Sequence, residues 1–124
     1  MEDKSVVLAV DDSAANLQLI HGLLNGEYNL RLAKSGKQAL AALSKFCPDI
    51  ILMDIEMPEL SGFEVMDEIR KNPALVNIPV IFISSHVVGE YIEKIAKYGA
   101  GDYITKPFTP NVLRAKIREV LARS

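Results

Sequence analysis

Acidic side chains follow two short apolar runs of this sequence, at the point where each run ends. Asp11 and Asp12 come directly after the run VVLAV, and Asp54 comes directly after IILM. Acidic residues are poor candidates for the inside of a sheet, so we expect each to mark the carboxyl end of a strand, where parallel sheets bind ligands. Two further runs end in residues that would share this edge: Ser84, Ser85 and Lys106.

Three carboxylates gathered at one edge would repel one another. At about 4 Å and an effective dielectric near 20, each pair costs roughly 4 kcal/mol, so the cluster should take up a proton or recruit a cation. Mg²⁺, which binds through oxygen and keeps several waters, suits a site this sparse, and Mn²⁺ could substitute for it. With the ion and the Lys106 ammonium nearby, a phosphoryl group at Asp54 would be stabilised. Each acid alone is more often a turn residue or a helix cap, but their order at successive strand ends favours a shared site.

Composition limits the class of protein. The chain has 124 residues, of which 49% are hydrophobic, and no Gly/Ser-rich or Pro-rich stretch divides it, so we expect one domain over residues 1–124. The net charge of -2 comes from acids and bases spread along the chain, which argues against direct nucleic-acid binding by this domain. Cys47 is the only cysteine, which excludes an internal disulfide, and we expect it to pack as a small hydrophobe. No membrane-length apolar segment or signal peptide is evident, so we expect a cytoplasmic protein with no membrane partner.

Two hydrophobic periods alternate along the chain. Short apolar runs predict five strands, three of them apolar enough to be buried on both faces: Val6 to Val10, Leu30 to Ala33, Ile50 to Met53, Val80 to Ile83 and Asp102 to Thr105. Between and after them lie five helical stripes, formed by Leu17, Ile20 and Leu24; Ala39, Leu40 and Leu43; Val65, Met66 and Ile69; Ile92, Ile95 and Ala96; and Leu113, Ile117, Val120 and Leu121. Right-handed crossovers then give an α/β fold of three layers, a parallel five-stranded sheet with helices on both faces.

The ends of the predicted helices have their own signals. The segments Ser35–Gln38 and Ser61–Glu64 both fit the capping box, in which two side chains satisfy each other's backbone amides. Thr109-Pro110 places a cap just before a proline at the first helical position. Gly26 and Gly99 fall where left-handed helix ends are expected.

Taken in order, four segments resemble the receiver domain of two-component response regulators. They are Asp11-Asp12, Asp54–Pro58, Ser84-Ser85 and Lys106–Phe108, and the resemblance extends from about residue 4 to residue 122. It implies the doubly wound (βα)₅, flavodoxin-like fold of CheY. It also implies a phosphorelay protein that takes a phosphoryl group from a sensor histidine kinase or a histidine phosphotransfer protein. Such a protein catalyses only its own phosphorylation and dephosphorylation and is not a turnover enzyme.

The resemblance gives the acidic residues separate roles. Asp54 matches the phosphoacceptor, which becomes an aspartyl phosphate. Asp12 and Asp54 match direct Mg²⁺ ligands, the backbone carbonyl of Glu56 matches a third, and Asp11 matches a ligand acting through water. Lys106 matches the lysine that pairs with the phosphoryl oxygens.

The resemblance also implies a switch. Ser84 matches the hydroxyl that moves to bond a phosphoryl oxygen, and Tyr103 matches the aromatic residue that turns inward behind it. Lys106-Pro107 resembles the cis peptide of the family, which would direct the ammonium group into the site.

Three more residues would flank the phosphoryl group. The small side chain of Ser85 suits a position that lines it, and Glu56 and His86 match positions that tune how fast water removes it. His86 is equally compatible with an ordinary exposed loop residue. The implied output surface is the fourth helix, fifth strand and fifth helix, which would contact an output domain or partner protein, with a homodimer as a further option.

Other functions fit less well. A haloacid dehalogenase-like phosphatase would need Asp-x-Asp after its first strand, whereas the two acids here are adjacent. A nucleotide-binding domain would need a glycine-rich phosphate loop, and neither common motif occurs. The main alternative is a receiver-like interaction module that works without phosphorylation; a missing acid, lysine or hydroxyl would favour it, and none is missing.

Overall fold

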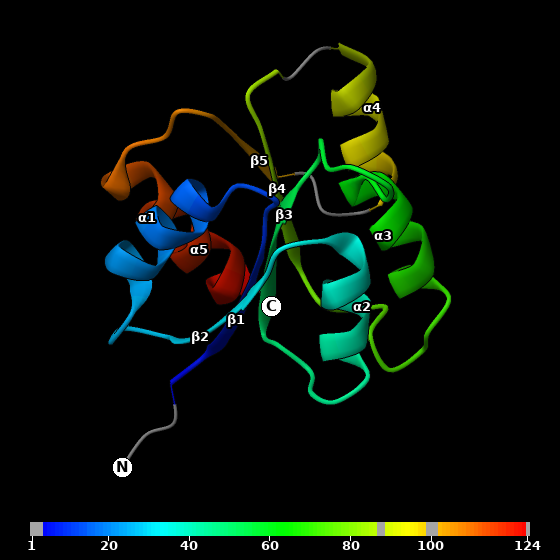
Figure 1. Ribbon diagram of the computed structural model, residues 1–124, viewed down its shortest axis with the longest axis horizontal. Coiled ribbons are helices and arrows are strands. Elements are labelled where there is room, and N and C mark those ends of the chain that lie inside the picture. Colours follow the sequence, from blue (N-terminus) through cyan, green and yellow to red (C-terminus); the bar gives the residue numbers. More distant parts are fainter. Residues whose placement is uncertain (1–3, 87–88, 99–101, 124) are drawn as a thin grey trace.

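The computed structural model describes residues 4–86, 89–98 and 102–123 and has three layers (Figure 1). Five strands make one parallel sheet in the order β2-β1-β3-β4-β5. The strands are β1 Val6–Val10, β2 Asn29–Ala33, β3 Ile50–Asp54, β4 Val80–Ser84 and β5 Asp102–Thr105. The helices are α1 Ala14–Leu24, α2 Gly36–Leu43, α3 Gly62–Arg70, α4 Gly89–Lys97 and α5 Pro110–Arg123. This confirms the predicted fold class and, to within a residue at either end, each predicted strand.

Helices cover both faces of the sheet. In Figure 1, α1 and α5 lie on one side and α2, α3 and α4 on the other. Successive strand residues alternate between the two layers, because side chains of a strand point to opposite faces. Val7 and Ala9 join the cluster under α1 and α5, whereas Leu8 and Val10 join the cluster under α2, α3 and α4. Apart from half-buried Val6 at the start of β1, the residues of β1, β3 and β4 are all buried, as expected for strands enclosed on both sides.

The predicted stripe of α4 is wrong in two of its three residues. Ile92 is 45% exposed and Ala96 is exposed, and only Ile95 is buried. The face that packs on the core is instead Tyr91, Ile95 and Tyr98, which have the same helical spacing. The rings of both tyrosines contact Phe63 of α3, and that of Tyr98 also contacts Phe82 of β4. The hydroxyl of Tyr98 donates to the Asp67 carboxylate over 2.6 Å. An apolar body with a hydrogen-bonded tip lets tyrosine occupy a partly buried position that aliphatic periodicity does not detect.

The helix caps agree with the sequence at two of three sites. The Ser61–Glu64 box is complete, with bonds of 3.2 and 2.9 Å. At α5 the Thr109 hydroxyl accepts from the amide of Val112. The Ser35 hydroxyl accepts from the Gln38 amide, but the Gln38 side chain bonds the amide of residue 34 instead of Ser35, so the predicted reciprocal box is incomplete. The φ angle of Ser35 is -155°, against -70° at Ser61, which points its own N–H in a different direction.

Three smaller predictions have different outcomes. Gly26 has a φ of +100°, as expected for a left-handed helix end. Gly99 lies outside the described residues. Cys47 is exposed, so the prediction that it packs as a small hydrophobe is wrong: α2 ends four residues earlier, and the chain carries Cys47 over the surface. Among the described residues, no helix has the length and apolar character needed to cross a membrane.

A close approach at Gly62 places α3 directly against the end of β3. The Gly62 amide donates to the Ile55 carbonyl over 2.8 Å, and a Cβ at this position would collide with the backbone carbonyl of Asp54. Because Gly62 has no side chain, the start of α3 can lie this close to the loop after Asp54.

Replacing Gly62 by alanine should lower the free energy of unfolding by about 1 to 3 kcal/mol, because backbone atoms must shift to admit the methyl group. Urea denaturation measures this. The matched control is Gly22→Ala in α1, where an added Cβ meets nothing within 4 Å, so the higher helix propensity of alanine should stabilise by up to about 1 kcal/mol. Equal effects of the two changes would contradict the tight contact.

Candidate functional site

Three carboxylates meet at the carboxyl ends of β1 and β3. Val10 is in register with Met53, so the residues that follow them are neighbours across the sheet. Asp11, Asp12 and Asp54 each offer an oxygen, and these oxygens lie within 4.8 Å of one another. Asp11 and Asp54 are buried, with 2% and 1% of their surface exposed, whereas Asp12 is exposed. The cluster therefore has two charges inside the protein and one facing solvent.

One ammonium group bridges the two buried acids. Lys106 follows β5, and its amide donates to the Ser84 carbonyl over 2.8 Å, which ties the residue to the end of β4. Its Nζ lies 3.1 Å from Asp54 Oδ1 and 3.1 Å from Asp11 Oδ2. The peptide bond between Lys106 and Pro107 is cis.

The electrostatics of the cluster leave it short of positive charge. Burial, and after it the Asp11 carboxylate, raise the pKa of Asp54 to about 7, although Lys106 opposes the rise. Burial lowers the pKa of Lys106, but bonds and charges from Asp11 and Asp54 outweigh this and the net pKa is raised. One ammonium therefore compensates two buried carboxylates incompletely. A hard divalent cation with oxygen ligands fits this donor set, and these three acids could hold one.

Asp11 is oriented by two bonds from the start of α1. Its carboxylate accepts from the Ser13 amide over 2.9 Å and from the Asn16 side-chain amide over 3.3 Å. Ser13 is also the cap of α1, so the helix start and the acid are fixed together. The sequence interpretation did not include Asn16. The sequence feature that could have indicated Asn16 is a polar residue in the first helical turn, three positions after the cap.

The Ser84 hydroxyl lies at the neighbouring strand end and is fully buried. It donates to the carboxylate of Glu56, whose two oxygens are 2.8 and 2.7 Å away, and it accepts from the His86 amide over 3.0 Å. The side chains of Ser85 and His86 are exposed, and Tyr103 is 37% exposed on β5. The structure thus brings Glu56 and Ser84 together and leaves the other three predicted residues at the surface.

A small hollow opens beside Asp12. It has a volume of about 200 Å³ and lies between the loops after β2 and β3, where Lys34 and Lys37 line it together with Glu59. Two lysines therefore lie near the solvent-facing acid of the cluster.

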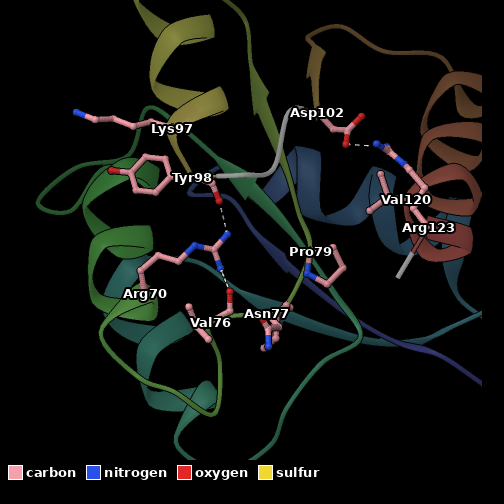
Figure 2. A pocket seen from close by; sticks show the side chains of 10 residues that line it. Arg70, Val76, Asn77, Pro79, Lys97, Tyr98, Asp102, Val120 and Arg123 are labelled. Atoms are coloured by element: carbon pink, nitrogen blue, oxygen red, sulfur yellow. Dashed lines mark hydrogen bonds and ion pairs between the residues drawn. The ribbon is translucent and has the colours of Figure 1, made fainter.

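Another hollow, of about 520 Å³, lies at the amino ends of β4 and β5, the edge opposite the acids (Figure 2). Its guanidinium groups already have partners: Arg70 donates to the backbone carbonyls of Val76 and Tyr98, and Arg123 bonds Asp102 over 2.8 Å. These bonds join the carboxyl ends of α3 and α5 to their neighbours, so the cations of this hollow do not converge on a common point.

The chain is similar to proteins of a known family. The family model for the response regulator receiver domain matches residues 7–118. The chain belongs to this family. As a receiver, it is a domain of two-component systems with a CheY-like fold.

Curated relatives carry receivers of similar sequence. The chain is 39% identical over 119 residues to a probable cyclic di-GMP phosphodiesterase of Vibrio cholerae, covering 94% of the chain and 27% of the relative. It is 36% identical to the response regulator PleD of Caulobacter vibrioides, covering 92% and 25%. It is also 36% identical to a probable transcriptional regulator, ycf27, of Guillardia theta, covering 100% and 48%. The receiver thus spans half or less of the length of these relatives.

Solved structures share its fold. The chemotaxis protein CheY4 of Vibrio cholerae superimposes with a TM-score of 0.89 at 30% identity, covering 94% of this receiver and 98% of that chain. A CheY-like receiver domain protein from Methanospirillum hungatei gives a TM-score of 0.89 at 27% identity, covering 98% and 96%.

The raised pKa of Asp54 predicts a pH dependence of the metal-free receiver. Because the folded state holds this proton up to about pH 7 and the unfolded state releases it near 3.8, the contribution of Asp54 to stability is lost as the pH rises between these values. Asp54→Asn removes the titrating group. As the pH rises, the unfolding free energy of the variant should therefore increase relative to that of the parent, by at most about 1.4 kcal/mol per pH unit.

Urea unfolding in a chelator at pH 5 and pH 8 measures the difference. Adding Mg²⁺ at pH 8 serves as the control and should stabilise the parent more than the variant. A difference between parent and variant that is the same at both pH values would show that the pKa of Asp54 is not raised.

Proposed function

We propose that this receiver accepts a phosphoryl group on Asp54 from the phosphohistidine of a sensor histidine kinase or a histidine phosphotransfer protein. The supporting observation is a buried carboxylate 3.1 Å from a lysine ammonium, beside two more carboxylates that suit a divalent cation. The same set disfavours a module that works without phosphorylation, because each acid, the lysine and the hydroxyl are present and adjacent.

The chain's own residues account for the transfer. An Asp54 oxygen attacks phosphorus while the bond from phosphorus to the donor imidazole nitrogen breaks, and the imidazole leaves with a proton. Lys106 holds Asp54 from one side, which orients the carboxyl group and opposes the rise of its pKa, and its Nζ then pairs with the phosphoryl oxygens. Asp12, Asp54 and the Glu56 backbone carbonyl would hold Mg²⁺ directly and Asp11 through water; Mn²⁺ could substitute. Once bound, the ion neutralises the charge on the phosphoryl oxygens.

Switching is assigned to residues that take no part in the attack. Ser84 would bond a phosphoryl oxygen, and Tyr103, now 37% exposed, would turn inward behind it. Ser85, Glu56 and His86 would flank the phosphoryl group and set how fast water removes it.

Output would pass through α4, β5 and α5. Exposed apolar side chains on these three elements support this surface: Ile92, Tyr103 and Val112. An output domain or partner protein would bind there, or a second copy of the receiver as a homodimer. We place the domain in the cytoplasm, with no direct contact to nucleic acid or membrane.

Asp54→Asn should abolish the incorporation of labelled, hydroxylamine-sensitive phosphate from acetyl phosphate in the presence of Mg²⁺, because the nucleophilic oxygens are lost. Gel autoradiography measures the label. The matched control is Asp49→Asn, an exposed acid just before the other end of the same strand, which should incorporate label at the parent level. Parent-level label in the Asp54→Asn variant would remove Asp54 from this role.

Asp12→Ala should weaken Mg²⁺ binding by about tenfold or more, equal to about 1.4 kcal/mol, and should reduce phosphorylation with it, because a direct ligand is lost. Asp11→Ala should weaken Mg²⁺ binding less if this acid acts through water. Calorimetric titration of both variants and the parent gives the affinities. Equal affinities in parent and Asp12→Ala would count against the site.

A further inference from the structure

The only proton of the Ser84 hydroxyl is committed to Glu56. Both carboxylate oxygens of Glu56 lie within 2.8 Å of Ser84 Oγ, and the buried hydroxyl accepts in turn from the His86 amide. A serine hydroxyl has one donor, so it cannot donate to Glu56 and to a phosphoryl oxygen at once. The two bonds exclude each other.

Glu56 also lies beside the start of α4, where it lines one hollow together with Phe63 and Tyr91. Burial raises the pKa of Tyr91, and a hydrogen bond and charge from Glu56 raise it further. The Tyr91 ring packs edge-on against Phe63 at 5.4 Å between centroids. Because Ile95 is the only fully buried residue of α4 among those described, Tyr91 is a substantial part of how the helix is held.

We propose that Glu56 is a positioning residue that holds Ser84 and Tyr91 in the resting arrangement and competes with the phosphoryl group for the Ser84 hydroxyl. The inference rests on the proposed function, in which Asp54 is phosphorylated and Ser84 binds a phosphoryl oxygen. The phosphoryl group adds negative charge, which repels the Glu56 carboxylate, and its oxygens offer the Ser84 hydroxyl a new acceptor. Glu56 then releases both the hydroxyl and Tyr91, which connects the strand end to the helix.

A double-mutant cycle separates this role from the negative charge of Glu56. Without Glu56 the hydroxyl is free, so Glu56→Ala should tighten the binding of beryllofluoride with Mg²⁺ by tenfold to a hundredfold, the range expected for one charge-assisted bond. In the Ser84→Ala background there is no hydroxyl to compete for, so the same substitution should have a much smaller effect. An equal gain in both backgrounds would mean that only charge repulsion is relieved and would overturn the proposal.

The matched control is Glu59→Ala. Glu59 lies in the same loop and pairs with Lys37 at the surface over 3.4 Å. The substitution removes the same charge, but Glu59 does not contact Ser84. Its effect on beryllofluoride affinity should therefore be small and equal in both backgrounds. A gain as large as that of Glu56→Ala would overturn the proposal.

A second measurement needs neither metal nor phosphoryl analogue. In the free protein, Glu56→Ala should shift the amide NMR signals of His86 and of the first turn of α4, because the bond to Ser84 and the carboxylate beside Tyr91 are lost. Unchanged signals in a protein that binds beryllofluoride normally would overturn the proposed role of Glu56 and leave the proposed function intact. Failure of the parent to bind beryllofluoride would overturn the proposed function and the competition with it.

Discussion

The site depends on two buried carboxylates that share one ammonium group. Asp11 and Asp54 come from adjacent strands, and the lysine that lies 3.1 Å from each comes from a loop 52 residues beyond Asp54. Like charges removed from water are costly unless they are compensated, so β1, β3 and the end of β5 must be held in one relative position. The compensation is incomplete, and this deficit of positive charge favours a cation at this edge of the sheet.

The sequence was sufficient wherever the position of a residue followed from strand parity and parallel register. Asp11, Asp12 and Asp54 come together because the carboxyl ends of neighbouring parallel strands share an edge, and that edge could be deduced from the apolar runs before them. The α4 stripe failed because the face that packs on the core includes two partly buried tyrosines, and hydrophobic periodicity does not count them. The bond between Glu56 and Ser84 joins residues 28 positions apart and depends on side-chain direction, which no sequence pattern specifies.

The packing of α4 is unlike that of the other helices. Its carboxyl end is tied to α3 through Tyr98, whose hydroxyl bonds Asp67 and whose carbonyl accepts from Arg70, the latter visible in Figure 2. Its amino end is held by Tyr91, through Phe63 and Glu56. Few buried apolar contacts mean that the position of this helix depends on specific polar bonds, which a change of charge can break. If the contacts of Tyr91 were lost, α4 would remain attached to α3 through Tyr98 and could rotate about that point.

The division between chemistry and switching follows from the charge of each group. In the proposed function, Lys106 and the acids belong to the transfer itself, because their electrostatic balance changes when a phosphoryl group is added. Ser84 is neutral and contributes one directional bond, so its choice of acceptor can change without altering the net charge of the core. Glu56 is the group that makes this choice costly in the resting state, since a hydroxyl already bonded to a carboxylate gains little from a new acceptor until that carboxylate is driven away. A receiver with an uncharged residue at this position would therefore populate the activated arrangement more at the same degree of phosphorylation.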